Sequence, residues 1–137
     1  MSIFFSILSA AYIAGIFLLA DSPMVSDVAA FNPYSLLHIP LYGILTILLV
    51  LSFRRKPSNP INPMNSTNSR NPLIAGLIAL VVAVADEIHQ AYIPSRDASI
   101  IDVFLDIVGI SLCLLLIKRI GQISGFSKIP KFLRRIP

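Results

Sequence analysis

Four apolar stretches dominate this sequence, and each is close to the length that a helix needs to cross a lipid bilayer. They span about residues 3–20, 34–53, 73–93 and 99–117. A bilayer core about 30 Å thick requires roughly 20 apolar residues in an α-helix. In a chain of 137 residues, these stretches leave little sequence for a soluble domain. We therefore predict an all-α fold, a four-helix transmembrane bundle that occupies residues 1–118.

The composition excludes two other classes of protein. Only 13% of the residues are charged and 55% are hydrophobic, whereas a soluble domain is typically about 25% charged. The net charge of +4 could suggest a nucleic-acid binder, but such a protein needs a basic surface that faces water. The single cysteine excludes a disulfide framework and a cysteine-based zinc site. We expect a membrane protein with no nucleic-acid partner.

The distribution of charge predicts the orientation of the chain. The connector at 54–72 and the tail from residue 118 contain basic residues and no acid, whereas all seven acidic residues lie in or beside the connections at 21–33 and 86–106. Basic segments stay on the cytoplasmic side of a membrane. We therefore predict that both termini are inside, with a cytoplasmic linker at 54–72 and a basic amphipathic cytoplasmic tail at 119–137.

Polar residues within the apolar stretches fall on common helix faces. At 100° per residue, each of three helices carries one polar arc. These arcs contain His38, Tyr42 and Thr46 in the second stretch, Asp86, Glu87 and Gln90 in the third, and Asp102, Asp106, Gly109 and Cys113 in the fourth. Because the charged members lie towards one membrane face, we predict a polar pocket that opens outward.

The chemistry of these residues suggests ligand binding. The residues that we expect to bind a ligand are His38, Glu87, Gln90, Arg96, Asp102 and Asp106. A guanidinium such as that of Arg96 matches the geometry of a phosphate or carboxylate. Glu87 and Asp102 are candidate catalytic residues, as a proton donor or acceptor and its partner. The alternative is that Arg96 pairs with Glu87 or Asp102 only to fix the turn between the last two helices.

A metal site is the other possibility at these positions. The side chains of His38, His89, Glu87 and Asp106 are ligand types that suit a divalent ion. Their spacing, however, matches no strong metal-binding signature, and the sequence contains no His-x-x-x-His pair. The sequence alone therefore leads us to expect neither a metal nor another cofactor.

The segment 86–109 resembles the signature of the VanZ-like family. The matching positions are Glu87, Gln90, Pro94, Arg96, Asp102 and Gly109, and Asp106 stands where the family usually has Asn. Residues 37–43 resemble the family's Lys-x-x-His segment, with Ser35 at the lysine position. Both departures make the site more acidic than in a typical member, which disfavours binding of an anion.

The resemblance implies a small multi-pass protein of the bacterial plasma (inner) membrane with a role at the cell envelope. The family's name refers to resistance to the glycopeptide teicoplanin. Our first hypothesis is a non-catalytic protein that binds a lipid-linked precursor or the head group of another amphiphile. The alternatives are a small intramembrane enzyme acting on a lipid-linked phosphate or sugar through Glu87, Asp102 and Arg96, and a subunit or scaffold of a membrane complex whose protein partner is unknown.

Overall fold

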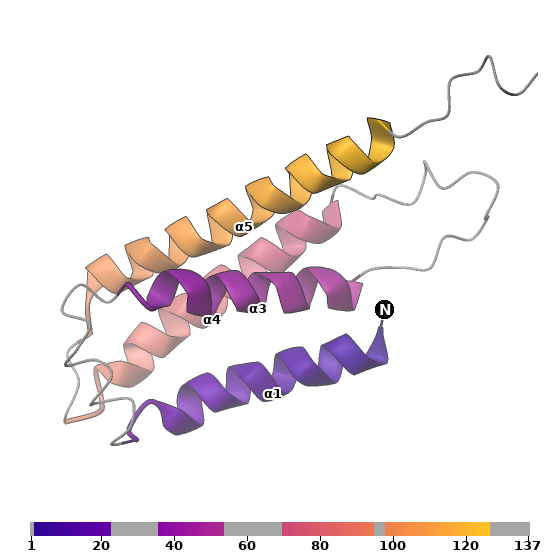
Figure 1. Ribbon diagram of the computed structural model, residues 1–137. Coiled ribbons are helices and arrows are strands. Elements are labelled where there is room, and N and C mark those ends of the chain that lie inside the picture. The colour runs from indigo at the N-terminus through magenta and orange to yellow at the C-terminus, as the bar shows by residue number, and fades with distance from the viewer. Residues whose placement is uncertain (1, 23–35, 54–69, 95–97, 127–137) are drawn as a thin grey trace, which may run out of the picture.

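The fold is all-helical over the residues that the computed structural model describes, which are 2–22, 36–53, 70–94 and 98–126. These residues form four α-helices and no strand. The helices are α1 (Ile3–Leu19), α3 (His38–Phe53), α4 (Arg70–Gln90) and α5 (Ile100–Phe126) (Figure 1). The predicted all-α class is confirmed. Most of the predicted linker and the end of the predicted tail lie outside the described residues.

The two C-terminal helices extend beyond the apolar stretches that predicted them. α4 begins at Arg70, ahead of the apolar stretch from residue 73, and α5 continues to Phe126, past residue 117. Hydropathy marks the segment that avoids water, whereas a helix continues for as long as its residues tolerate helical geometry. Lys118 and Arg119 are good helix formers, so the charge at the end of the apolar stretch does not stop α5.

Two of the helices are long and apolar enough to cross a membrane. They are Pro72–Gln90, with 19 residues, and Ile100–Ile120, with 21 residues. α1 and α3 are also apolar but contain 17 and 16 residues. At about 1.5 Å per residue they extend for about 25 Å, which is less than a bilayer core of about 30 Å. The structure thus shows two candidate membrane-spanning helices, and a bundle with four spans stays a prediction.

Helix α3 occupies the centre of the bundle. It packs against α1, α4 and α5, and α4 also contacts α1 and α5 (Figure 1). The core around α3 is formed by Tyr42, Leu45, Leu49, Val50, Ala75, Ala79, Ala83 and Ile110. The three alanines recur every fourth residue, so they form one face of α4. Their small side chains let neighbouring helices approach α4 closely.

The closest approach of α3 to α5 depends on Gly109. A Cβ atom at this position would overlap the carbonyl oxygen of Ile39 and lie 3.0 Å from its Cα atom. Gly43 of α3 faces the same crossing, but a Cβ atom there would lie 3.7 Å from the carbonyl oxygen of Gly109, which is ordinary contact. Gly109 therefore lets the two backbones touch near the start of α3.

Helix α1 is attached to α3 at both ends of their contact. The backbone N–H of Ser2 donates a hydrogen bond to the carbonyl oxygen of Ser52 at 3.0 Å. Further along α1, the hydroxyl of Tyr12 donates to the carbonyl oxygen of Leu41 at 3.1 Å. The two helices consequently run in opposite directions, with the end of α1 beside the start of α3 (Figure 1).

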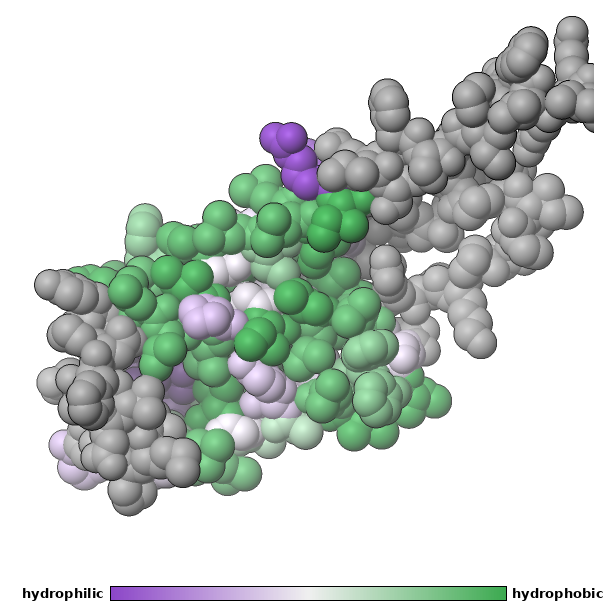
Figure 2. All heavy atoms as spheres, viewed as in Figure 1, coloured by the Kyte–Doolittle hydropathy of each residue, from purple (hydrophilic) through white to green (hydrophobic). Residues whose placement is uncertain are grey.

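The outer surface of the bundle is apolar. Figure 2 shows hydrophobic residues over most of the visible face of the described helices. Large exposed side chains on α4 and α5 include Leu77, Val81, Phe104, Leu115 and Leu116. Soluble proteins rarely expose continuous apolar patches larger than a few hundred Å². This surface is suited to contact with lipid, and the polar side chains are instead gathered inside.

Candidate functional site

Buried polar side chains gather at the end of the bundle where α3 and α5 begin and α4 ends. Four carboxylic acids are buried here, with exposed fractions of 2% for Asp86, 6% for Glu87, 7% for Asp102 and 0% for Asp106. We call this set, together with His38 and Gln90, the polar cluster. Its members come from three helices, so the cluster exists only when α3, α4 and α5 are packed together.

His38 connects the start of α3 to α5. Its Nδ1 atom lies 2.9 Å from Oδ1 of Asp106. When Asp106 is ionised, its carboxylate can only accept, and Nδ1–H is then the donor. The other ring nitrogen, Nε2, lies 3.8 Å from Oδ2 of Asp102, which is too long for a hydrogen bond. The close approach at Gly109, one turn beyond Asp106, brings His38 within reach of α5.

Asp86 is held by a tyrosine and a glutamine. The Tyr42 hydroxyl donates to Oδ2 of Asp86 at 3.2 Å, and Nε2 of Gln90 donates to the same oxygen at 3.1 Å. Neither Asp86 nor Tyr42 was among the predicted site residues. The sequence did indicate Asp86, because it lies on the same helical arc as Glu87 and Gln90. Gln90 is thus occupied in orienting a neighbouring carboxylate.

Glu87 connects the end of α4 to the start of α5. Its Oε2 atom accepts a hydrogen bond at 2.8 Å from the backbone N–H of Ser99. Oγ of Ser99 accepts in turn from the N–H of Ile101 at 3.2 Å, which caps the first turn of α5. A carboxylate beside a helix N-terminus is favoured by the helix dipole. Glu87 therefore joins the end of α4 to the start of α5 through Ser99. Arg96 lies outside the described residues.

Several buried polar atoms of this region have no hydrogen-bond partner among the described residues. They are Oδ1 of Asp86, Oε1 of Glu87, Oδ2 of Asp106 and Nδ1 of His89. A buried acceptor without a partner costs about 1–3 kcal/mol, so such atoms mark places where a bound group would be stabilised. The His89 ring packs against Phe17 of α1 at a centroid distance of 5.4 Å.

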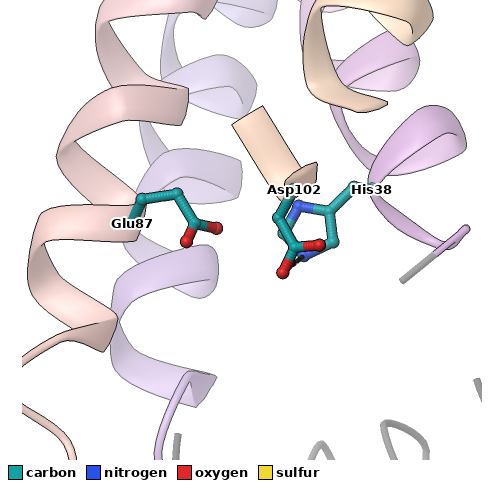
Figure 3. Close-up of side chains that lie close together, drawn as sticks. All are labelled: His38, Glu87 and Asp102. Carbon is teal, nitrogen blue, oxygen red and sulfur yellow. Dashed lines mark ion pairs between the residues drawn. The ribbon is translucent and has the colours of Figure 1, made fainter. Parts of the chain in front are cut away.

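Three side chains of the polar cluster converge on one point. His38, Glu87 and Asp102 each present a nitrogen or oxygen atom, and these atoms all lie within 4.8 Å of one another. In Figure 3 the Glu87 carboxylate extends from α4 towards the Asp102 carboxylate and the His38 ring. The three residues lie on different helices, so spacing along the sequence could not reveal their convergence. Of the six residues predicted to bind a ligand, the structure brings together all five that it describes.

The fold and this cluster define a class: an α-helical protein with two candidate membrane-spanning helices and a buried acidic cluster at one end of its helices. The sequence model of the VanZ/LLP1 family matches residues 4–121, and the chain therefore belongs to the VanZ/LLP1 family. The match covers every member of the polar cluster and confirms the resemblance seen in segment 86–109. No curated protein and no solved structure matches the chain.

Proposed function

We propose that this protein crosses the bacterial plasma membrane four times and binds the polar head group of an amphiphile at the polar cluster. The observation that carries the proposal is the burial of four carboxylic acids at one end of an otherwise apolar bundle. Charged groups inside a membrane domain are costly and usually serve a function or an internal pair. Lipid-linked envelope precursors suit such a site, because a long apolar chain carries their polar head group.

The direction of the bundle supports a site on the outer face. Lys118 and Arg119 are exposed near the other end of the apolar part of α5 from Asp102. Basic residues beside a span favour the cytoplasmic side. With that orientation, both termini are cytoplasmic and the polar cluster lies at the outer leaflet. A head group in that leaflet can reach the cluster while its tail lies along the apolar faces of α4 and α5.

The chemistry of the cluster favours a ligand that donates hydrogen bonds. Carboxylates, which accept hydrogen bonds, outnumber donors among the described residues of the cluster. Hydroxyl and ammonium groups of a sugar or amine match such acceptors. An anionic group requires a cation beside it, and Arg96 is the candidate that the sequence offers. Altered sensitivity to teicoplanin is the cellular effect that we propose for binding an envelope precursor.

The proposal is tested by lipid binding to the purified protein in nanodiscs. A photoreactive polyprenyl-linked disaccharide is the probe, and covalent labelling is counted by mass spectrometry. We expect Glu87→Ala and Arg96→Ala to reduce labelling at least tenfold. Leu18→Ala, on the exposed apolar surface of α1 and away from α4 and α5, is the control and should label like the wild type. Unchanged labelling and unchanged teicoplanin sensitivity in both site variants would contradict the proposal.

The same incubation separates binding from catalysis. If Glu87 and Asp102 act as an acid–base pair, the probe is converted and a product of different mass accumulates. We expect the probe to be recovered intact. If the wild-type protein converts the probe and Glu87→Gln does not, the enzymatic alternative is supported and the proposal of binding without catalysis is wrong.

A further inference from the structure

The convergence of His38, Glu87 and Asp102 has the composition of a metal site. One imidazole and two carboxylates offer nitrogen and oxygen donors, a mixture that suits first-row divalent ions such as Zn²⁺. Catalytic zinc sites commonly use three protein ligands and leave the remaining position to water or another ligand. The three residues come from α3, α4 and α5, and they point towards a shared space (Figure 3).

The orientation of His38 is the one that a metal ligand requires. A histidine that binds a metal through one ring nitrogen almost always donates the other N–H to a carboxylate, carbonyl or water. Here Nδ1 lies 2.9 Å from Oδ1 of Asp106, which is fully buried, and Nδ1–H is the donor when Asp106 is ionised. In the neutral ring this leaves the lone pair on Nε2, which faces Asp102 at 3.8 Å. Asp106 is then the outer residue that fixes the tautomer of His38 and the direction of its ring.

Glu87 supplies a second, independent observation. Its Oε2 atom is held by the N–H of Ser99 at 2.8 Å, which fixes the carboxylate. Its Oε1 atom is buried and has no hydrogen-bond partner, although the residue is only 6% exposed. The Glu87 carboxylate thus has one fixed oxygen and one buried oxygen without a partner, and it extends towards an imidazole and a second carboxylate (Figure 3). A cation would stabilise this arrangement.

We infer that His38, Glu87 and Asp102 bind one divalent first-row metal ion, with Zn²⁺ as the best match. Two atoms bound to the same zinc ion are at most about 4.2 Å apart, twice a bond of about 2.1 Å. The ligand atoms lie within 4.8 Å of one another, so side-chain movements of less than about 1 Å bring them into range. The ion would also offset the charge of the four buried acids. This inference does not depend on which amphiphile the protein binds.

The competing explanation is an ion pair without metal. A protonated His38 could pair with Asp106 and Asp102 directly, and the cluster would then serve only to hold α3 against α5. The two explanations differ in one measurable respect. In a metal site, removal of any one of Glu87, Asp102 and His38 weakens the binding of an added metal ion. An ion pair without metal gives no such binding.

The first experiment measures the ion in the wild-type protein. The chain is purified in detergent with an affinity tag that contains no histidine, stripped with a chelator and titrated with Zn²⁺ alone. We expect saturation at one ion per chain. X-ray absorption at the zinc edge should show nitrogen or oxygen neighbours at about 2.0–2.2 Å. Failure to saturate, or a bound ion with a hydrated spectrum, would overturn the inference.

Substitutions assign the ion to these residues. Glu87→Gln keeps an acceptor for the Ser99 N–H but removes the carboxylate, and His38→Gln and Asp102→Asn remove the other two ligands. We expect each variant to lose saturable binding, and Asp106→Asn to weaken it about tenfold through the orientation of His38. Circular dichroism and gel filtration establish that each variant is folded.

Two controls make the result specific. Cys113→Ala removes the chain's single cysteine, a buried thiol of α5 that does not belong to the polar cluster. His89→Gln removes the chain's other histidine. For both variants, the dissociation constant for Zn²⁺ should lie within about threefold of the wild-type value. That ratio corresponds to less than about 1 kcal/mol of binding free energy. If folded Glu87→Gln and Asp102→Asn bind as tightly as these controls, the ion is not held by the cluster and the inference is wrong.

Discussion

His38 at the start of α3 and Asp106 in the second turn of α5 form a hydrogen bond of 2.9 Å, although 68 residues separate them in the chain. Asp106 is fully buried, and its other carboxylate oxygen has no hydrogen-bond partner among the described residues. The pair therefore joins two helices through a group that is costly to leave unpaired. It is also the contact that orients the imidazole towards Asp102 and Glu87.

We expect the effects of substituting His38 and Asp106 on the free energy of unfolding to be coupled. In a double-mutant cycle of His38→Ala and Asp106→Ala, the two single changes should each destabilise the protein, and the double variant should be less destabilised than their sum. Residues that share a buried polar contact typically show coupling of about 0.5–3 kcal/mol. The measurement is the free energy of unfolding in detergent, with a chelator present to remove any metal contribution. Additive effects would show that the pair contributes nothing to the packing of α3 on α5.

Gly109 should tolerate no side chain, whereas Gly43 should. Gly109→Ala places a methyl group onto the backbone of Ile39, and the two helices must separate. Overpacking of this kind typically costs about 1–3 kcal/mol. Gly43→Ala is the matched control, because its methyl group meets only an ordinary contact at 3.7 Å and alanine favours a helix by about 1 kcal/mol. Thermal unfolding of both variants tests the contrast, and equal melting temperatures would contradict it.

Removing the Tyr42 hydroxyl should lower the free energy of unfolding more than removing the Tyr12 hydroxyl does. Tyr42→Phe leaves Asp86 with Gln90 as its remaining donor among the described residues, and Asp86 is 2% exposed. Leaving a buried acceptor short of a donor costs about 1–3 kcal/mol. In Tyr12→Phe, the lost bond goes to the neutral backbone carbonyl of Leu41, and Tyr12 is itself half-buried. Chemical denaturation in detergent measures both losses, and a larger loss in Tyr12→Phe would be inconsistent with this assignment.

The proposed orientation predicts which positions face water on each side of the membrane. In a Cys113→Ala background, Tyr92→Cys should react with an impermeant maleimide on intact cells. Lys118→Cys should react only after the membrane is permeabilised, and Val81→Cys should stay unreactive in both conditions because it faces lipid. All three side chains are exposed in the isolated chain, so lack of reaction reports the membrane rather than burial by protein. Labelling of Lys118→Cys on intact cells would reverse the proposed topology.

Helical periodicity was sufficient to predict which side chains face inward. Asp102, Asp106, Gly109 and Cys113 share an arc of α5, and all four are buried. The reason is physical: once a segment is helical, positions three or four residues apart lie on one face. The ends of the helices were less predictable, because α4 and α5 continue through polar residues that hydropathy counts as loop.

The pairings between helices could not be predicted from the sequence. Nothing local indicates that His38 meets Asp106, that Glu87 accepts from Ser99, or that Tyr42 donates to Asp86. These contacts depend on the rotation of each helix about its axis and on how closely two helices approach. The close approach at Gly109 sets the rotation and the separation of α3 and α5. The sequence shows a glycine in an apolar stretch, but it does not indicate which backbone that glycine will contact.

The distribution of the polar cluster over three helices also has a consequence for how the protein is made. A membrane protein's helices enter the bilayer first and associate afterwards. α3 is synthesised well before α5, so His38 has no Asp106 to meet until the last helix is in place. The cluster is therefore completed at the final step of assembly. In the proposed membrane topology, a chain truncated before α5 would carry His38 and Glu87 in the bilayer without their partners Asp106 and Ser99, and we expect membrane quality control to recognise it.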